Sequence, residues 1–178
     1  MRRHILLVGL PGSGKSTVGK LVAEALGAKV IDVDGLLVRE MGMPISQIFG
    51  MVGEARFREM ERDAVKAARG GDPCVIVPGG GWAAQPGELE SAKESSLTLY
   101  LKCSAATATK RSEQGEARPL LAGMDPGQKM RALLQEREPF YLQAHHQVNT
   151  ENVPAEAVAA EVMGLARQHG GWLPRSGP

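Results

Sequence analysis

One eight-residue segment near the start of the chain restricts its fold more than any other feature. Gly9–Ser16 reads GLPGSGKS and fits the pattern G-x-x-x-x-G-K-[S/T]. The apolar run Ile5–Val8 precedes it, as a strand buried on both faces would, and apolar residues at helical spacing follow it as far as Gly27. In this strand–loop–helix context the motif predicts a phosphate-binding loop, with an ordinary glycine-rich turn as the alternative.

The chemistry of such a loop follows from its residue types. Glycines allow backbone N–H groups to turn inward around an anion, and a helix that begins at Lys15 adds the positive end of its dipole. Lys15 should reach the β- and γ-phosphates, and the Ser16 hydroxyl should bind Mg²⁺. We therefore predict that the chain binds a nucleoside triphosphate with Mg²⁺ through Gly12, Ser13, Gly14, Lys15, Ser16 and Thr17.

Short apolar segments alternate with helical patterns along the rest of the chain. We expect strands over 5–8, 30–31, 74–77, 97–101 and 147–148, and later helices over 54–69, 105–112, 130–138 and 155–168, with the third of these stopping before Pro139. This alternation predicts an α/β fold, a doubly wound parallel sheet of five strands with helices on both faces. One domain should span residues 1–169, followed by a frayed tail over 170–178.

Composition excludes several classes of protein. The formal net charge of +1 over 178 residues argues against a general nucleic-acid binder. No apolar run approaches the roughly 20 residues that a membrane-spanning helix needs. Cys74 and Cys103 form no C-x-x-C pair, which predicts reduced thiols in a cytoplasmic protein. We also expect a monomer.

Two aspartates follow the second predicted strand, at the edge of the sheet where ligands bind in this fold class. We expect Asp32 and Asp34 to lie in an extended segment, where one approaches Mg²⁺ through water and the other meets an acceptor hydroxyl. Two solvated loop carboxylates are the alternative. Asp32–Gly35 also fits the D-x-x-G pattern of nucleotide-driven switches, but the chain has no N-K-x-D motif, so we favour a phosphotransferase over a switch.

Further candidates come from spacing. Arg58 and Glu61 share a helix face and can pair, which would orient a guanidinium toward a carboxylate, although a surface ion pair is the simpler explanation. Gly79–Gly81 follow a buried strand and would permit close backbone approach to a ligand, or a flexible turn. Arg118 lies in a glycine-rich loop over 115–127, a suitable place for a lid, and Arg137 lies near a helix end, where it can simply oppose the helix dipole.

Taken together and in order, these motifs resemble the shikimate kinase family of small P-loop kinases. The similarity runs from about Ile5 to Pro154. Its motifs are GLPGSGKST at Gly9–Thr17, D-V-D at Asp32–Asp34, G-E-x-x-F-R-x-x-E at Gly53–Glu61, GGG at Gly79–Gly81, RPLL at Arg118–Leu121 and R-x-x-x-Y at Arg137–Tyr141.

The resemblance implies a P-loop NTPase fold of the nucleoside-monophosphate-kinase type, with a substrate-binding helical region at about 33–62 and a lid at about 113–125. It implies transfer of the γ-phosphate of ATP to the 3-hydroxyl of shikimate with Mg²⁺ as cofactor. Its implied site residues are Asp34 at the hydroxyl, Arg58 and Arg137 on the substrate carboxylate, Glu61 positioning Arg58, the Gly80 and Gly81 backbone on the substrate, Arg118 on phosphate, Ser16 on Mg²⁺ with Asp32 behind its waters, and Arg111 and Pro154 around adenine.

Departures from the family pattern lie on both sides of the glycine triplet and affect the acceptor. Pro78 precedes the triplet, and Val77 stands where the family often has a small hydroxyl residue. Trp82 follows the glycine triplet where the family usually has a smaller residue, so it either narrows the acceptor pocket or packs behind it. A related kinase for another hydroxy acid, such as gluconate, is therefore the second reading.

Overall fold

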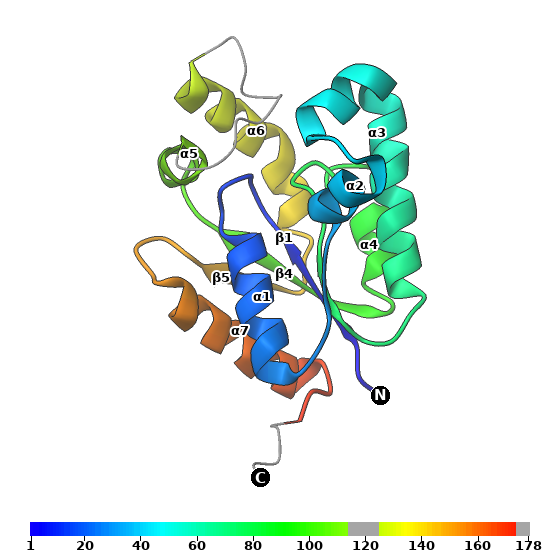
Figure 1. Cartoon of the computed structure of the whole chain (residues 1–178). Helices are drawn as coiled ribbons and strands as arrows, with labels where there is room; N and C mark the ends of the chain where they lie inside the picture. Colours follow the sequence, from blue (N-terminus) through cyan, green and yellow to red (C-terminus); the bar gives the residue numbers. More distant parts are fainter. Residues whose placement is uncertain (114–124, 174–178) are drawn as a thin grey trace.

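A parallel β-sheet forms the centre of the protein. The computed structural model describes residues 1–113 and 125–173, and within them the sheet has five strands in the order β2-β3-β1-β4-β5 (Figure 1). All four pairings are parallel, which confirms the predicted fold class. The strands are β1 His4–Val8, β2 Val30–Asp32, β3 Val75–Val77, β4 Ser96–Lys102 and β5 His146–Asn149.

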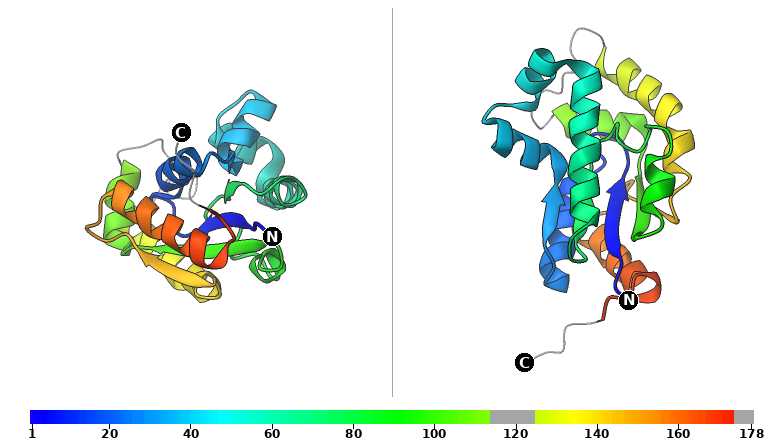
Figure 2. Two further views of the ribbon diagram at one scale, coloured as in Figure 1. Left: turned by 90° about the horizontal axis from the view of Figure 1, so that it is seen from below. Right: turned by 90° about the vertical axis from the view of Figure 1, so that its right-hand side faces the viewer.

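Helices cover both faces of this sheet (Figures 1 and 2). On one face Ile5 and Leu7 of β1 pack in a cluster with α1 and α7, and on the other Leu6 and Val8 pack with the remaining helices. Because successive side chains of a strand point to opposite faces, a strand covered on both sides must be apolar throughout. The helices are α1 Lys15–Leu26, α2 Val33–Met41, α3 Ile45–Arg69, α4 Glu88–Ala92, α5 Ala105–Glu113, α6 Pro126–Tyr141 and α7 Ala155–His169.

Helix α2 begins directly after β2, so the prediction of an extended segment at Asp34 is wrong. Asp32 is the N-cap of this helix, and its Oδ1 accepts a hydrogen bond from the Gly35 N–H at 3.4 Å. Aspartate is a favoured N-cap because its carboxylate satisfies a free N–H group of the first turn. The Asp34 side chain therefore projects from the first turn of a helix, at a position fixed by the neighbouring cap.

Helix α3 is interrupted at Gly53, where φ is 79° and ψ is 167°. A positive φ is easily adopted by glycine, which has no Cβ. The predicted helix over 54–69 corresponds to the segment after this break, which carries Arg58 and Glu61. The segment before it, over 45–52, lies in the region expected to be helical and to bind substrate.

Helix α6 is longer than predicted at both ends. It begins at Pro126, with Asp125 as an N-cap that accepts a hydrogen bond from the Gln128 N–H at 3.0 Å. It also continues past Pro139 to Tyr141, contrary to the expectation of a stop before the proline. Proline removes the hydrogen bond to the carbonyl four residues earlier, but Gln135 is exposed, so water can take the place of the missing donor. The buried side chain of Tyr141 anchors the last turn.

The two ends of the described chain pack together beside the start of β1 (Figure 2). Arg3 N–H donates to the Gly170 carbonyl at 2.9 Å, and the indole Nε1 of Trp172 donates to the Arg3 carbonyl at 2.9 Å. The Trp172 side chain is 3% exposed. The prediction of a frayed tail is therefore wrong for residues 170–172, and residues 174–178 lie outside the described residues.

The predicted lid falls almost entirely on residues that the structure does not describe. Residues 114–124, which include Arg118, are among them.

Cys74 and Cys103 are free and buried. Within the described ranges, no helix is both long and apolar enough to cross a membrane.

Candidate active site

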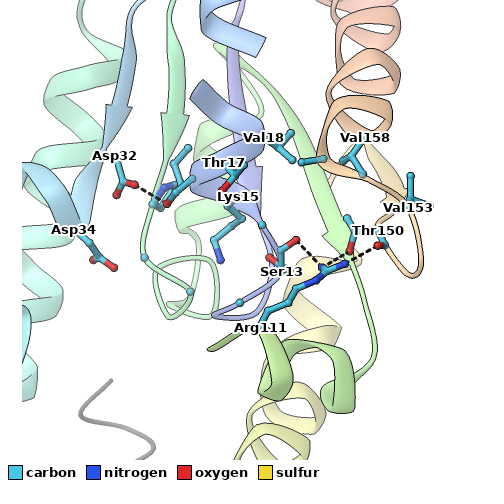
Figure 3. Close-up of a pocket in the computed structure, with 18 residues that line it drawn as sticks. Ser13, Lys15, Thr17, Val18, Asp32, Asp34, Arg111, Thr150, Val153 and Val158 are labelled. Atoms are coloured by element: carbon cyan, nitrogen blue, oxygen red, sulfur yellow. Dashed lines mark hydrogen bonds between the residues drawn. The ribbon is translucent and has the colours of Figure 1, made fainter. Parts of the chain in front are cut away.

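A pocket of about 450 Å³ opens at the carboxyl edge of the sheet (Figure 3). This is the edge at which ligands bind in open α/β folds. Its walls come from five separate stretches of chain: Gly12–Val18 of the loop and α1, Asp32 and Asp34, Val77–Gly80, Arg111 of α5, and Thr150, Val153, Ala155 and Val158 around the start of α7. The structure thus brings together the predicted phosphate loop, both aspartates, part of the glycine triplet and Arg111.

The phosphate loop takes a path that requires glycine. Gly12 has φ 80° and Gly14 has φ 94°, and Gly14 is the residue that precedes α1. A Cβ on Gly12 would lie 2.4 Å from the Ala108 carbonyl oxygen of α5, so a side chain there would also clash with backbone. The loop therefore wraps tightly around the N-terminus of α1, where helical N–H groups and the helix dipole favour an anion.

Lys15 lies inside this loop. Its side chain is buried, and its Nζ donates to the Gly9 and Leu10 carbonyls, each at 2.8 Å. These bonds hold the ammonium group at the mouth of the loop, and the side chain points into the pocket (Figure 3). A fixed positive charge at this position complements phosphate oxygens.

Ser16 and Asp32 form the oxygen-rich wall of the pocket. The Ser16 hydroxyl donates to Asp32 Oδ2 at 2.6 Å, while Oδ1 of the same carboxylate caps α2. A hydroxyl beside a carboxylate offers hard oxygen donors, and Mg²⁺ prefers a few such ligands together with water and phosphate. This donor set fits Mg²⁺.

The far end of the pocket is built around Arg111. Its Nη2 donates to the Thr150 carbonyl at 2.8 Å, and its Nη1 donates to Thr150 Oγ1 at 3.2 Å and to the Ser13 carbonyl at 3.4 Å. The guanidinium is therefore fixed beside the loop before α7 (Figure 3). Pro154 itself does not line the pocket, but Val153 and Ala155 on either side of it do.

Sequence reasoning missed four of the lining residues at this end, Thr150, Val153, Ala155 and Val158. Their only sequence signal is proximity to Pro154, which marks the loop. The burial of Val158 on the inner face of α7 follows from helical spacing, but its position against the pocket needs the tertiary structure.

A second cluster of charges lies beside Asp34. Glu61 is fully buried, and its Oε2 accepts a hydrogen bond from Arg58 Nη1 at 2.7 Å. The predicted pairing is present, and it is not the surface ion pair that we considered as its alternative. Burial raises the pKa of the Glu61 carboxyl, while the Arg58 guanidinium works in the opposite direction. Glu54 Oε1 approaches Arg58 Nη2 at 3.8 Å from the preceding turn.

The glycine triplet is the surface on which these side chains meet. A Cβ on Gly79 would lie 2.3 Å from Glu61 Oε1 and 3.1 Å from Asp34 Oδ1, and one on Gly81 would lie 2.6 Å from Arg58 Cζ. Glycine is therefore needed here for close approach to the protein's own side chains. The carboxylates and guanidiniums are consequently held against the backbone at the pocket wall.

Among the residues that the structure describes, two buried polar atoms of this cluster have no hydrogen-bond partner, Arg137 Nη1 and Glu61 Oε1. The Arg137 side chain reaches the cluster from α6 and is 5% exposed, and its Nη1 lies 3.2 Å from the position of a Cβ on Gly80. Buried donors are nearly always satisfied, so an unpartnered guanidinium N–H group indicates a place for an acceptor atom from a ligand. An anionic group would suit it.

Trp82 packs behind the triplet. Its side chain is fully buried in the hydrophobic cluster that also contains Phe57 and Tyr141, and it does not line the pocket. Of the two possibilities raised by the sequence, the structure therefore shows packing, here behind the glycine triplet.

The family model for shikimate kinase matches residues 11–166. The chain belongs to the shikimate kinase family. Shikimate kinase of Mycobacterium marinum is 43% identical over 141 residues, which are 79% of this chain and 76% of the relative. That of Symbiobacterium thermophilum is 38% identical over 170 residues, 94% of this chain and 98% of the relative. Among solved structures, shikimate kinase from Acinetobacter baumannii in complex with shikimate superposes with a TM-score of 0.89 at 32% identity, covering 94% of each chain. As a shikimate kinase the protein is an ATP-dependent phosphotransferase.

Proposed function

We propose that this member of the family transfers the γ-phosphate of ATP to the 3-hydroxyl of shikimate, giving shikimate 3-phosphate and ADP on the route to chorismate and the aromatic amino acids. The observation that carries the proposal is a pair of arginines, the half-buried Arg58 and the buried Arg137, beside the Asp34 carboxylate and next to the phosphate-loop pocket. Two guanidiniums suit a carboxylate, and a neighbouring carboxylate suits a hydroxyl that must lose its proton.

ATP would lie along the pocket in Figure 3. Its phosphates would bind the N–H groups of Gly12, Ser13, Gly14, Lys15, Ser16 and Thr17, and its adenine would lie between Arg111 and the loop around Pro154. Ser16 would hold Mg²⁺, with Asp32 behind its water ligands. The ion supplies positive charge to the phosphate oxygens and orients them. We propose that Arg118, which the structure does not describe, contacts phosphate from the lid.

The acceptor would lie between the two clusters of charge. Arg58 and Arg137 would bind its carboxylate, Glu61 would hold Arg58 in place, and the Gly80 and Gly81 backbone would contact the ring. In the reaction the 3-hydroxyl oxygen forms a bond to the γ-phosphorus, the bond from that phosphorus to the bridging oxygen of ADP breaks, and the hydroxyl proton passes to Asp34. Lys15 would stabilise the negative charge that develops on the transferring group.

An ADP-release assay with several acceptors tests this proposal. The enzyme is supplied with ATP and Mg²⁺ together with shikimate, gluconate, a nucleoside monophosphate or no acceptor. We expect ADP release with shikimate alone. ADP release with gluconate and not with shikimate would show that gluconate is the acceptor. Equal release without any acceptor would show that the enzyme hydrolyses ATP and is not a kinase. A monomeric state and a cytoplasmic location remain predictions from the sequence.

A further inference from the structure

A tyrosine that the proposed mechanism does not use is hydrogen-bonded to the glycine triplet. The Tyr141 hydroxyl donates to the Gly80 carbonyl at 2.6 Å, and the Tyr141 side chain is fully buried. Tyr141 ends α6, one turn after Arg137. Its ring packs against that of Tyr100 on β4 with a centroid separation of 5.1 Å, and the Tyr100 hydroxyl donates to Glu138 Oε2 at 2.7 Å.

The Gly80 carbonyl belongs to the same peptide unit as the Gly81 N–H. A peptide unit is planar and trans, so its C=O and N–H point in opposite directions and turn together. Fixing the Gly80 carbonyl therefore also fixes the Gly81 N–H, which points away from Tyr141. Because glycine tolerates more backbone conformations than other residues, such a contact limits the orientations that a stretch of three glycines can adopt.

Gly80 also lies at the junction of the two halves of the site. A Cβ on Gly80 would be 3.0 Å from Pro11 Cδ of the phosphate loop and 3.2 Å from Arg137 Nη1. Gly80 lines the pocket itself. The hydrogen bond from Tyr141 therefore ties the helix that carries Arg137 to the backbone that lies between Arg137 and the phosphate loop.

We propose that Tyr141 is a positioning residue for the acceptor: its hydroxyl holds the Gly80–Gly81 peptide in one orientation and fixes the spacing between that peptide and Arg137. This inference rests on the proposed function, because it assigns Gly81 N–H and Arg137 to acceptor binding. Tyr141 acts through these groups.

The protonation state of Tyr141 agrees with a donor role. Burial raises its pKa to about 12, although the neighbouring Arg137 guanidinium favours the ionised form. The hydroxyl therefore keeps its proton near neutral pH and can donate it to the carbonyl in a hydrogen bond. It does not serve as a base for the acceptor.

Tyr100 provides a matched control. Both tyrosines lie in the same ring pair, both are buried, and their hydroxyl hydrogen bonds are of similar length. The Tyr100 hydroxyl bonds to Glu138, however, and not to the triplet. If the aromatic pair serves only to fill the core, the two phenylalanine variants should behave alike.

The experiment compares Tyr141→Phe and Tyr100→Phe in the full-length enzyme. We measure kcat, the KM values for shikimate and ATP, the melting temperature and, by calorimetry, the dissociation constants of shikimate and ADP. Loss of one buried hydrogen bond that acts on binding should raise the KM and the dissociation constant for shikimate about tenfold in Tyr141→Phe. Its values for ATP and ADP should stay within about twofold of wild type, and Tyr100→Phe should bind shikimate like wild type.

Several results would overturn the proposal. The first is that both variants have the same KM and dissociation constant for shikimate. The second is that Tyr141→Phe weakens the binding of shikimate and of nucleotide equally. The third is that Tyr141→Phe no longer unfolds cooperatively, which would give Tyr141 a purely structural role. Wild-type enzyme that binds shikimate without releasing ADP would contradict the proposed reaction alone, because the dissociation constants would still compare the variants. Wild-type enzyme that binds no shikimate would contradict both.

Discussion

Replacement of Gly79 by alanine tests how closely Glu61 and Asp34 are packed against the glycine triplet. The new methyl carbon would lie 2.3 Å from Glu61 Oε1, whereas ordinary contacts begin at 3.4 Å. The Glu61 carboxylate would have to move by roughly 1 Å to restore a normal van der Waals contact. Its side chain is only 1% exposed and is bonded to Arg58 at 2.7 Å, so movement comes at the expense of that bond.

The size of the effect follows from the bond that is lost. A hydrogen bond between charged groups contributes about 1.5–3 kcal/mol, so we expect Gly79→Ala to lower the free energy of unfolding by about 2 kcal/mol. In a domain of this size that corresponds to a melting temperature lower by about 4–8 °C. Arg58 would lose its fixed orientation, and the KM for shikimate should rise about tenfold or more.

Circular dichroism melting and a coupled ADP assay measure both quantities. Gly164→Ala in α7 is the control, because a Cβ there meets no atom within 4 Å. Alanine at this helical position should raise the free energy of unfolding by about 0.5–1 kcal/mol and leave the KM for shikimate unchanged. Wild-type melting and wild-type KM in Gly79→Ala would show that Glu61 moves freely, and would refute this close packing.

Three further predictions concern single side chains. Asp34→Asn should lower kcat by about a hundredfold or more while ADP binds as in wild type, and unchanged turnover would remove Asp34 from the chemistry. Arg58→Ala should raise the KM for shikimate. It should also lower the free energy of unfolding by about 3 kcal/mol, because the buried Glu61 carboxylate loses its partner. An equal rise in the KM for ATP would contradict the role of Arg58 in acceptor binding. Burial lowers the pKa of His4 below its ordinary 6.5, so the unfolded chain binds more protons and the free energy of unfolding should fall as the pH drops from about 6.5. Urea titrations at several pH values measure this pH dependence. His4→Asn should reduce it only in part, because burial also lowers the pKa of His145. An unaltered pH dependence would show that His4 does not contribute.

The positions of the strands and of the phosphate loop were predictable because each depends on local sequence. A short, continuous apolar run such as Val75–Val77 has few alternatives to a buried strand, and the loop motif specifies both its own path and the helix after it. The pairing of Arg58 with Glu61 follows from helical spacing for the same reason.

Features that depend on competing local effects were predicted less well. Asp34 was expected in an extended segment because D-x-D after a strand carries no helical period, and the cap formed by Asp32 decided otherwise. Pro139 was expected to end α6, but the burial of Tyr141 outweighs the loss of one solvent-accessible hydrogen bond. The contact between Tyr141 and Gly80 joins residues 61 positions apart, and no local pattern predicts it.

The location of the two tryptophans gives this enzyme a built-in optical probe. Trp82 is fully buried directly after the glycine triplet, and Trp172 is packed against Arg3 at the opposite end of the sheet. Fluorescence from Trp82 should therefore respond to changes around the triplet, while that from Trp172 should follow the association of the two chain ends. A Trp172→Phe chain would carry one indole behind the glycine triplet, so binding at the proposed acceptor site can be followed without a label.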